Sequence, residues 1–93
     1  MIATLLLMFF AGVFAANAVP HFVKGITRER FPTPFGGSPV VNVTAGWFMF
    51  LIAAALVGFA DLGRHTVASV ASAAVGVLLM SLFHARIGAF GRQ

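Results

Sequence analysis

The sequence predicts an all-α integral membrane protein with three transmembrane helices and an ordered interfacial loop between the first two. Composition is the first reason: 60% of the 93 residues are hydrophobic and only 9% are charged, whereas soluble domains are about 45–50% apolar and about 25% charged. The second reason is that the apolar residues form three runs, each close to the roughly 20 residues that a helix needs to cross a bilayer. These spans use nearly the whole chain, so we expect one membrane domain, residues 1–93, without a soluble catalytic module.

The first apolar run predicts a helix at about residues 2–19. It carries no charged side chain, and at roughly 1.5 Å per residue it would be about 27 Å long, just enough to span. Its end, Ala16-Asn17-Ala18, also resembles a signal-peptidase site. No basic residue precedes the run and several follow it, which is the reverse of a secretory signal. We therefore expect the helix to be retained, with cleavage as the alternative.

Residues 20–38 are predicted to form a loop at the lipid headgroup level. Pro20 is expected to stop the first helix, and the segment Phe31-Pro32-Thr33-Pro34-Phe35 favours extended backbone because residues before proline avoid the helical region. Half of the chain's charged side chains lie in this loop. We expect the basic residues Lys24, Arg28 and Arg30 to contact anionic lipids. Phe31 and Phe35 are expected to lie in the interface between lipid and water. A flexible connector is the alternative.

The second and third helices are predicted at about residues 39–60 and 66–87. Ser38 is suited to cap the second helix, with Pro39 at its first position. Because only residues 61–65 separate the two runs, we expect these helices to form an antiparallel hairpin. Trp47 lies near the start of the second helix, at the depth where aromatic belts form.

The basic residues predict the orientation of the chain. Lys24, Arg28 and Arg30 lie between the first two helices, and Arg86 and Arg92 follow the third. The positive-inside rule places both groups in the cytoplasm, with the N-terminus and residues 61–65 outside. The formal charge of +4 does not indicate nucleic acid as a partner, because the basic residues are scattered at helix ends.

Small side chains at four-residue spacing predict helix-packing faces. In lipid, helices gain most from close backbone approach at such residues. They are Gly12 and Ala16 in the first helix, Ala54 and Gly58 in the second, and Ala68, Ser72 and Gly76 in the third. The three helices could satisfy one another within a monomer, but the third offers small residues on more than one side. This favours a homo-oligomer or a complex with other membrane protein subunits.

The polar residues give little sign of catalysis. His21 and His84 are expected at the cytoplasmic ends of their helices, where two imidazoles are weak candidates for a metal or haem site because no carboxylate or cysteine supports them. Asn17 and Asn42 lie near the same boundary and are expected to bond between helices or to loop carbonyls. No nucleophile with a base and no phosphate-binding glycine motif occurs. We expect no catalytic residue, no metal and no cofactor.

A string of residues carries a resemblance: Pro20-His21-Phe22, Gly25, Phe31 to Gly36, Ser38-Pro39, Asn42 and Gly46-Trp47. It resembles a recurring signature of short, uncharacterised bacterial integral membrane proteins. The resemblance implies a multi-pass protein of the bacterial inner membrane and no particular activity.

Two functions are consistent with these features. The first is a non-catalytic small subunit or scaffold that packs through its small-residue helix faces on copies of itself or on a larger complex. The alternative is a homo-oligomeric channel or transporter for a small solute or ion, with serines 69, 72 and 81 along its path. No carboxylate lies in the middle of a span, which disfavours proton or sodium coupling.

Overall fold

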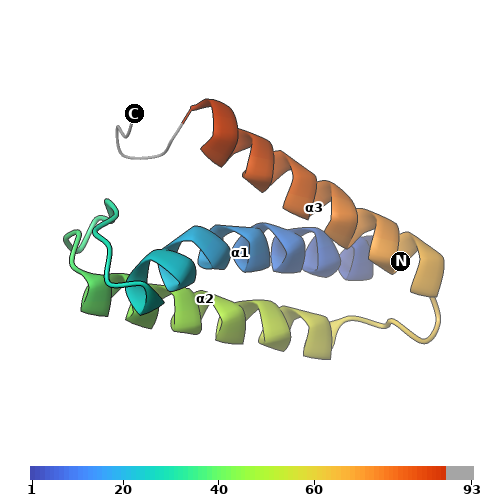
Figure 1. Cartoon of the computed structure of the whole chain (residues 1–93). Helices are drawn as coiled ribbons and strands as arrows, with labels where there is room; N and C mark the ends of the chain where they lie inside the picture. The colour runs from blue at the N-terminus through green and yellow to red at the C-terminus, as the bar shows by residue number, and fades with distance from the viewer. Residues whose placement is uncertain (88–93) are drawn as a thin grey trace.

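A computed structural model describes residues 1–87, which form three helices and no strand. The helices are α1 (Ile2–Ile26), α2 (Pro39–Phe59) and α3 (Thr66–Arg86), joined by a loop at residues 27–38 and a turn at residues 60–65 (Figure 1). All three are long and apolar enough to cross a membrane. The predicted fold class, an all-α multi-pass membrane protein, is therefore confirmed.

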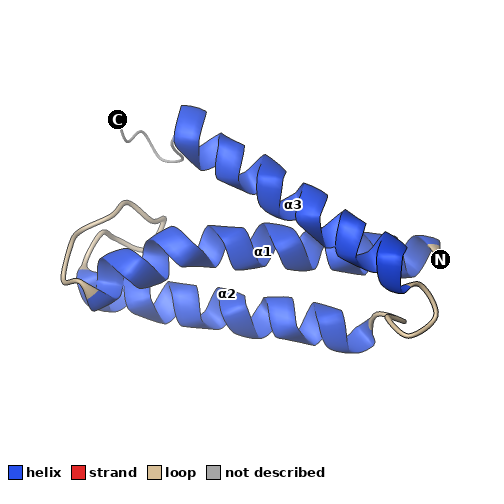
Figure 2. Ribbon diagram, turned by 45° about the vertical axis from the view of Figure 1, so that its right-hand side comes forward, coloured by secondary structure: helices blue, strands red, loops and turns tan. Residues whose placement is uncertain are grey.

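The central helix is α1, and both other helices pack against it (Figures 1 and 2). α2 runs antiparallel to α1, while α3 runs parallel to it and leans away toward its own C-terminal end. The prediction that the second and third helices form an antiparallel hairpin is therefore right in direction, but α2 and α3 each pack on α1 and touch each other only weakly. The short turn reverses the chain, but the backbone contacts that lipid favours are available on α1 and not between α2 and α3.

α1 continues through Pro20 and ends at Ile26, so the prediction that Pro20 stops the helix is wrong. Proline removes one helical hydrogen bond, the one that the carbonyl of Ala16 would accept. Packing of the next two turns against α2 compensates, because His21 and Gly25 are buried there. Transmembrane helices tolerate proline when neighbouring helices hold the segment in place. The loop between α1 and α2 is correspondingly shorter than predicted.

Two glycines allow α1 and α3 to touch. A Cβ atom on Gly12 would overlap the backbone of Ala73, and one on Gly76 would overlap the backbone of Phe9. Across the same contact, the hydroxyl of Ser72 donates to the carbonyl oxygen of Leu5 at 2.7 Å. Backbone approach of this kind requires residues without a large side chain.

α2 uses a different face from the one predicted. A Cβ atom on Gly46 would lie 2.7 Å from the backbone nitrogen of Phe22, and one on Gly25 would lie 2.5 Å from that of Val43. Gly58 has no atom within 4 Å of such a position, and Ala54 is exposed. The predicted packing pair Ala54 and Gly58 therefore faces away from α1, because α2 is rotated to bury Gly46.

A local cap fixes the start of α2, and a long-range hydrogen bond holds the chain just after its end. The hydroxyl of Ser38 accepts a hydrogen bond from the amide of Val41 at 3.1 Å, which confirms the predicted cap. At the far end, the amide of Asp61 donates to the hydroxyl of Thr4 at 3.0 Å. This bond ties the turn at residues 60–65, hereafter the turn end, to the start of α1. The opposite end, which carries residues 27–38, is the loop end.

Candidate functional site

Polar side chains from all three helices meet near the loop end. Asn17 and His21 come from α1, Asn42 from α2 and His84 from α3; together they form the histidine–asparagine cluster. Polar groups inside a membrane must find partners within the protein, because lipid tails offer none. The cluster is therefore the part of the molecule where polar chemistry is concentrated.

Asn42 joins α1, α2 and the loop. It is fully buried, and its amide nitrogen donates to the carbonyl oxygens of Phe31 at 2.7 Å and Ser38 at 3.0 Å. Its oxygen lies 2.7 Å from Nδ1 of His21. A carboxamide oxygen can only accept, so Nδ1 of neutral His21 carries the proton and Nε2 keeps a free lone pair.

Asn17 joins α1 to both other helices. Its oxygen lies 2.6 Å from Nε2 of His84, and its amide nitrogen donates to the sulfur of Met49 at 3.1 Å. By the same reasoning, His84 donates through Nε2 and keeps a lone pair on Nδ1. The prediction that both asparagines bond between helices or to loop carbonyls is confirmed.

The two histidines are neighbours. Their ring centroids are 6.4 Å apart and the rings are nearly perpendicular, at 78°. Phe31, from the loop, lies edge-on to His21 at 5.1 Å and near His84 at 6.5 Å. Within residues 1–87, no three His, Cys, Asp or Glu side chains gather closely enough to hold a metal ion. Both rings instead use one nitrogen to join helices.

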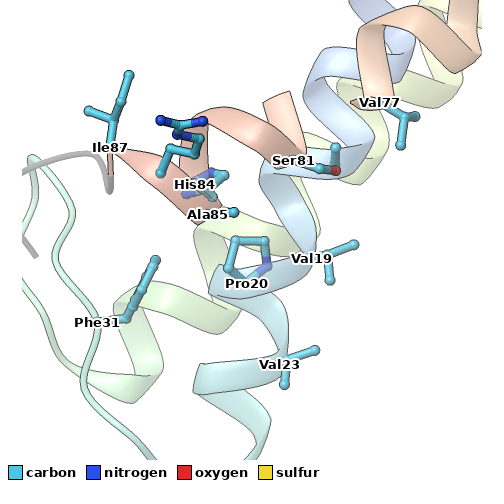
Figure 3. Close-up of a pocket in the computed structure, with 11 residues that line it drawn as sticks. Val19, Pro20, Val23, Phe31, Val77, Ser81, His84, Ala85 and Ile87 are labelled. Carbon is cyan, nitrogen blue, oxygen red and sulfur yellow. The ribbon is translucent and has the colours of Figure 1, made fainter. Parts of the chain in front are cut away.

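Two grooves flank the cluster. The first lies between α1 and α3, has a volume of about 790 Å³ and is lined by Val19, Pro20, Val77 and His84 among others (Figure 3). The second lies between α1, α2 and the loop, has a volume of about 560 Å³ and is lined in part by His21. Each histidine therefore borders its own groove.

The predicted interfacial residues are spread over the surface of the loop end. Arg28 and Arg30 are exposed, as are Phe35 and Trp47. Phe31 differs from them, since it is half-buried against the histidines.

Lys24 lies in the last turn of α1 and forms an ion pair with Glu29 at 2.9 Å. The hydrogen bond from Lys24, and then its positive charge, hold the pKa of Glu29 below its usual value.

The predicted packing residues do not all meet. Gly12, Gly76 and Ser72 lie in the contact of α1 and α3, and Ala68 is half-buried beside it. Ala16 is half-buried and lines the first groove.

Sequence reasoning missed the pairing of each asparagine with a particular histidine. The available signal was an asparagine inside an otherwise apolar run, which indicates a bonded partner but not which one.

Comparison of the chain with known protein families, curated proteins and solved structures gives no match. The resemblance carried by residues 20–47 therefore stays a prediction. The function has to be argued from the geometry of the helices and the cluster.

Proposed function

We propose that the protein is a non-catalytic small subunit or scaffold of the bacterial inner membrane, which associates with copies of itself or with other membrane chains. The observation that carries the proposal is an open face on α3. Ser69 and Gly76 are buried, and Gly76 lies against the backbone of Phe9 in α1. On the opposite side, four exposed residues follow one another at spacings of four, three and four, and we call them the α3 outer face: Val67, Ala71, Ala74 and Leu78.

This face has the features of a helix-packing seam. Alternating spacings of three and four keep residues on one line along a helix. Its two central residues are alanines, which let a second backbone approach closely where lipid tails would gain nothing from their small size. α2 packs on α1 and touches α3 only weakly, and all four residues of the line are exposed, so no other helix among residues 1–87 covers it. A second chain is the partner that fits it.

The polar cluster supports a structural role. Each histidine uses one nitrogen for a bond that joins two elements. The chain has only two acidic residues; Glu29 is paired with Lys24, and Asp61 lies at the turn end. The cluster therefore lacks a carboxylate that could orient an imidazole for acid–base chemistry. Its bonds stabilise the helix arrangement that presents the α3 outer face.

The alternative function, a channel or transporter, gains less support. Of the three serines expected along a path, Ser69 is fully buried and Ser72 donates to the carbonyl of Leu5 in the contact with α1. Only Ser81 is exposed. A polar path between chains would need more groups than this one hydroxyl.

Single cysteines test the proposal directly, because the natural chain has none. We expect Ala71→Cys and Ala74→Cys to crosslink in native membranes, either to a second copy or to a larger partner. Ala55→Cys, an exposed position on α2, is the matched control and should stay uncrosslinked. Equal crosslinking at all three positions, or a single-chain mass after gentle extraction with no crosslinks, would refute the proposed association.

A further inference from the structure

We propose that the groove between α1 and α3 binds one anionic phospholipid, with an acyl chain against its apolar walls and the phosphate at Arg86. This site is separate from the α3 outer face and does not depend on association with another chain. The lipid contacts expected from the loop are general surface attraction, whereas this site would hold a single molecule between helices.

The walls of the groove suit an acyl chain. α3 leans away from α1 near the loop end (Figure 1), and three valines that line the groove are partly exposed. Val19 is 49% exposed, Val23 47% and Val77 41%. Figure 3 shows these side chains together with Pro20 along the groove. A furrow of about 790 Å³ with apolar walls offers water few partners, since an ordered water needs two to four polar groups.

The rim of the groove suits a phosphate. Arg86 lines it beside His84 and Ser81. The chain's two acidic side chains both lie near other basic residues: Glu29 pairs with Lys24 at 2.9 Å, and Asp61 lies 4.0 Å from Arg64. Arg86 therefore has no acidic partner within residues 1–87. A guanidinium binds phosphate through two parallel hydrogen bonds.

The surroundings strengthen the charge complementarity. Arg28 and Arg30 lie in the loop, at the same end of the bundle as the C-terminal end of α3. Basic pockets between transmembrane helices recognise the headgroups of anionic lipids. A guanidinium without an acidic partner among residues 1–87, above an apolar furrow, matches both the phosphate and the acyl chain of such a lipid. A free phosphate lacks the acyl chain, and a zwitterionic lipid brings a cation of its own next to the arginines.

The test uses the full chain in nanodiscs that contain equal amounts of phosphatidylglycerol and phosphatidylcholine with identical acyl chains. After release from the nanodiscs, native mass spectrometry counts the lipids that remain bound. We expect the parent chain to retain one phosphatidylglycerol in preference to phosphatidylcholine. Arg86→Gln should lower that preference by about tenfold, equivalent to about 1.4 kcal/mol. Arg64→Gln, which removes the same charge at the turn end, should leave it unchanged.

Two further variants separate the parts of the site. Arg28→Gln removes a charge at the loop end outside the groove, so an effect as large as that of Arg86→Gln would mean general surface attraction and would overturn the proposal. Val19→Trp fills the groove and should abolish retention of both lipids, while Leu51→Trp, at an exposed position on α2, should not. Retention by the Val19 variant, with its helix content intact by circular dichroism, would place the lipid elsewhere. Equal retention of the two lipids by the parent would refute recognition by Arg86.

Discussion

At the scale of single residues, one polar side chain, Asn42, joins several elements of this apolar chain. Its three hydrogen bonds connect α2 to His21 of α1 and to the loop carbonyls of Phe31 and Ser38. Asn42 is fully buried, so water has no access to replace these bonds. Asn42 therefore joins α1, α2 and the loop, but it forms no hydrogen bond with α3.

Replacement of Asn42 by alanine is expected to destabilise the protein by about 1–3 kcal/mol, because the ring donor of buried His21 and the carbonyl of Phe31 lose their partner. The free energy of unfolding in mixed detergent micelles, followed by circular dichroism, measures this loss. Thr44→Ala, at an exposed position on the same helix, should change it by less than about 0.5 kcal/mol. Equal stability of the two variants would show that the Asn42 bonds are not needed for the fold.

Glu29 provides a prediction about pH. The neighbouring Lys24 holds the pKa of Glu29 below its usual value. Since the folded pKa is lower than the unfolded one, the pair stabilises the fold above the unfolded pKa, and this contribution is lost as the pH falls through the folded pKa. Both side chains are exposed, so the effect is small and screened by salt.

An NMR titration of the Glu29 carboxylate in nanodiscs checks this prediction. The midpoint should lie below that of an unpaired glutamate, and Lys24→Met should raise it toward the ordinary value. Arg28 lies in the same loop as Glu29 but forms no bond with it. Arg28→Met should therefore shift the midpoint less than Lys24→Met does. A midpoint in the parent that Lys24→Met does not raise would contradict the ion pair.

At the scale of helices, α3 depends on its contact with α1, because α2 touches it only weakly and the loop reaches it through Phe31 near His84. Gly76 brings the backbones together, and Ser72 adds one hydrogen bond across the contact. Loss of this contact would free α3 from the bundle while leaving its own helical hydrogen bonds intact. Insertion and packing of α3 can therefore be separated by mutation.

Gly76→Leu is expected to detach α3 from α1 without preventing membrane insertion, because leucine favours insertion but would overlap the backbone of Phe9. Overpacking of this kind typically costs about 1–3 kcal/mol. A cysteine pair at Phe9 and Ser72 would report the contact through disulfide yield, which should fall in the variant. Gly58→Leu is the matched control, since Gly58 has open space around it. Unchanged yield in the Gly76 variant would show that this glycine does not set the contact.

At the scale of the whole molecule, the two ends of the bundle carry different numbers of basic residues. The loop end carries Lys24, Arg28, Arg30 and Arg86, while the turn end carries Asp61 and Arg64, which form a weak pair at 4.0 Å. The positive-inside rule counts basic residues and places the richer end in the cytoplasm. Our proposed orientation follows from this asymmetry.

Reporter fusions test the orientation. A fusion after Gln93 should be active only with a cytoplasmic reporter, and an insertion at Gly63 only with a periplasmic one. Replacement of Lys24, Arg28 and Arg30 by glutamine should weaken this preference, because three of the basic residues that set it are lost. Periplasmic activity of the fusion at Gln93 in the parent would invert the topology.

The fold class and most helix ends could be predicted from the sequence because their causes are local. The length of an apolar run determines whether a helix can span a bilayer, and the cap at Ser38 depends on a residue three positions away. The same local reasoning failed at Pro20, where a proline signals the end of a helix. Packing of the following turns against α2 keeps α1 helical, and no local pattern reports that contact.

The sequence by itself therefore determined that this is a membrane chain of three helices, where most of those helices lie, and which end carries the positive charge. Only the tertiary structure decided that α1 is central, that Asn42 binds His21 and Asn17 binds His84, and that Ala54 and Gly58 face outward. These features depend on the rotation of each helix about its axis. Several small-residue faces compete for the contact in lipid, and the choice is made by backbone fit between residues that are distant in the chain.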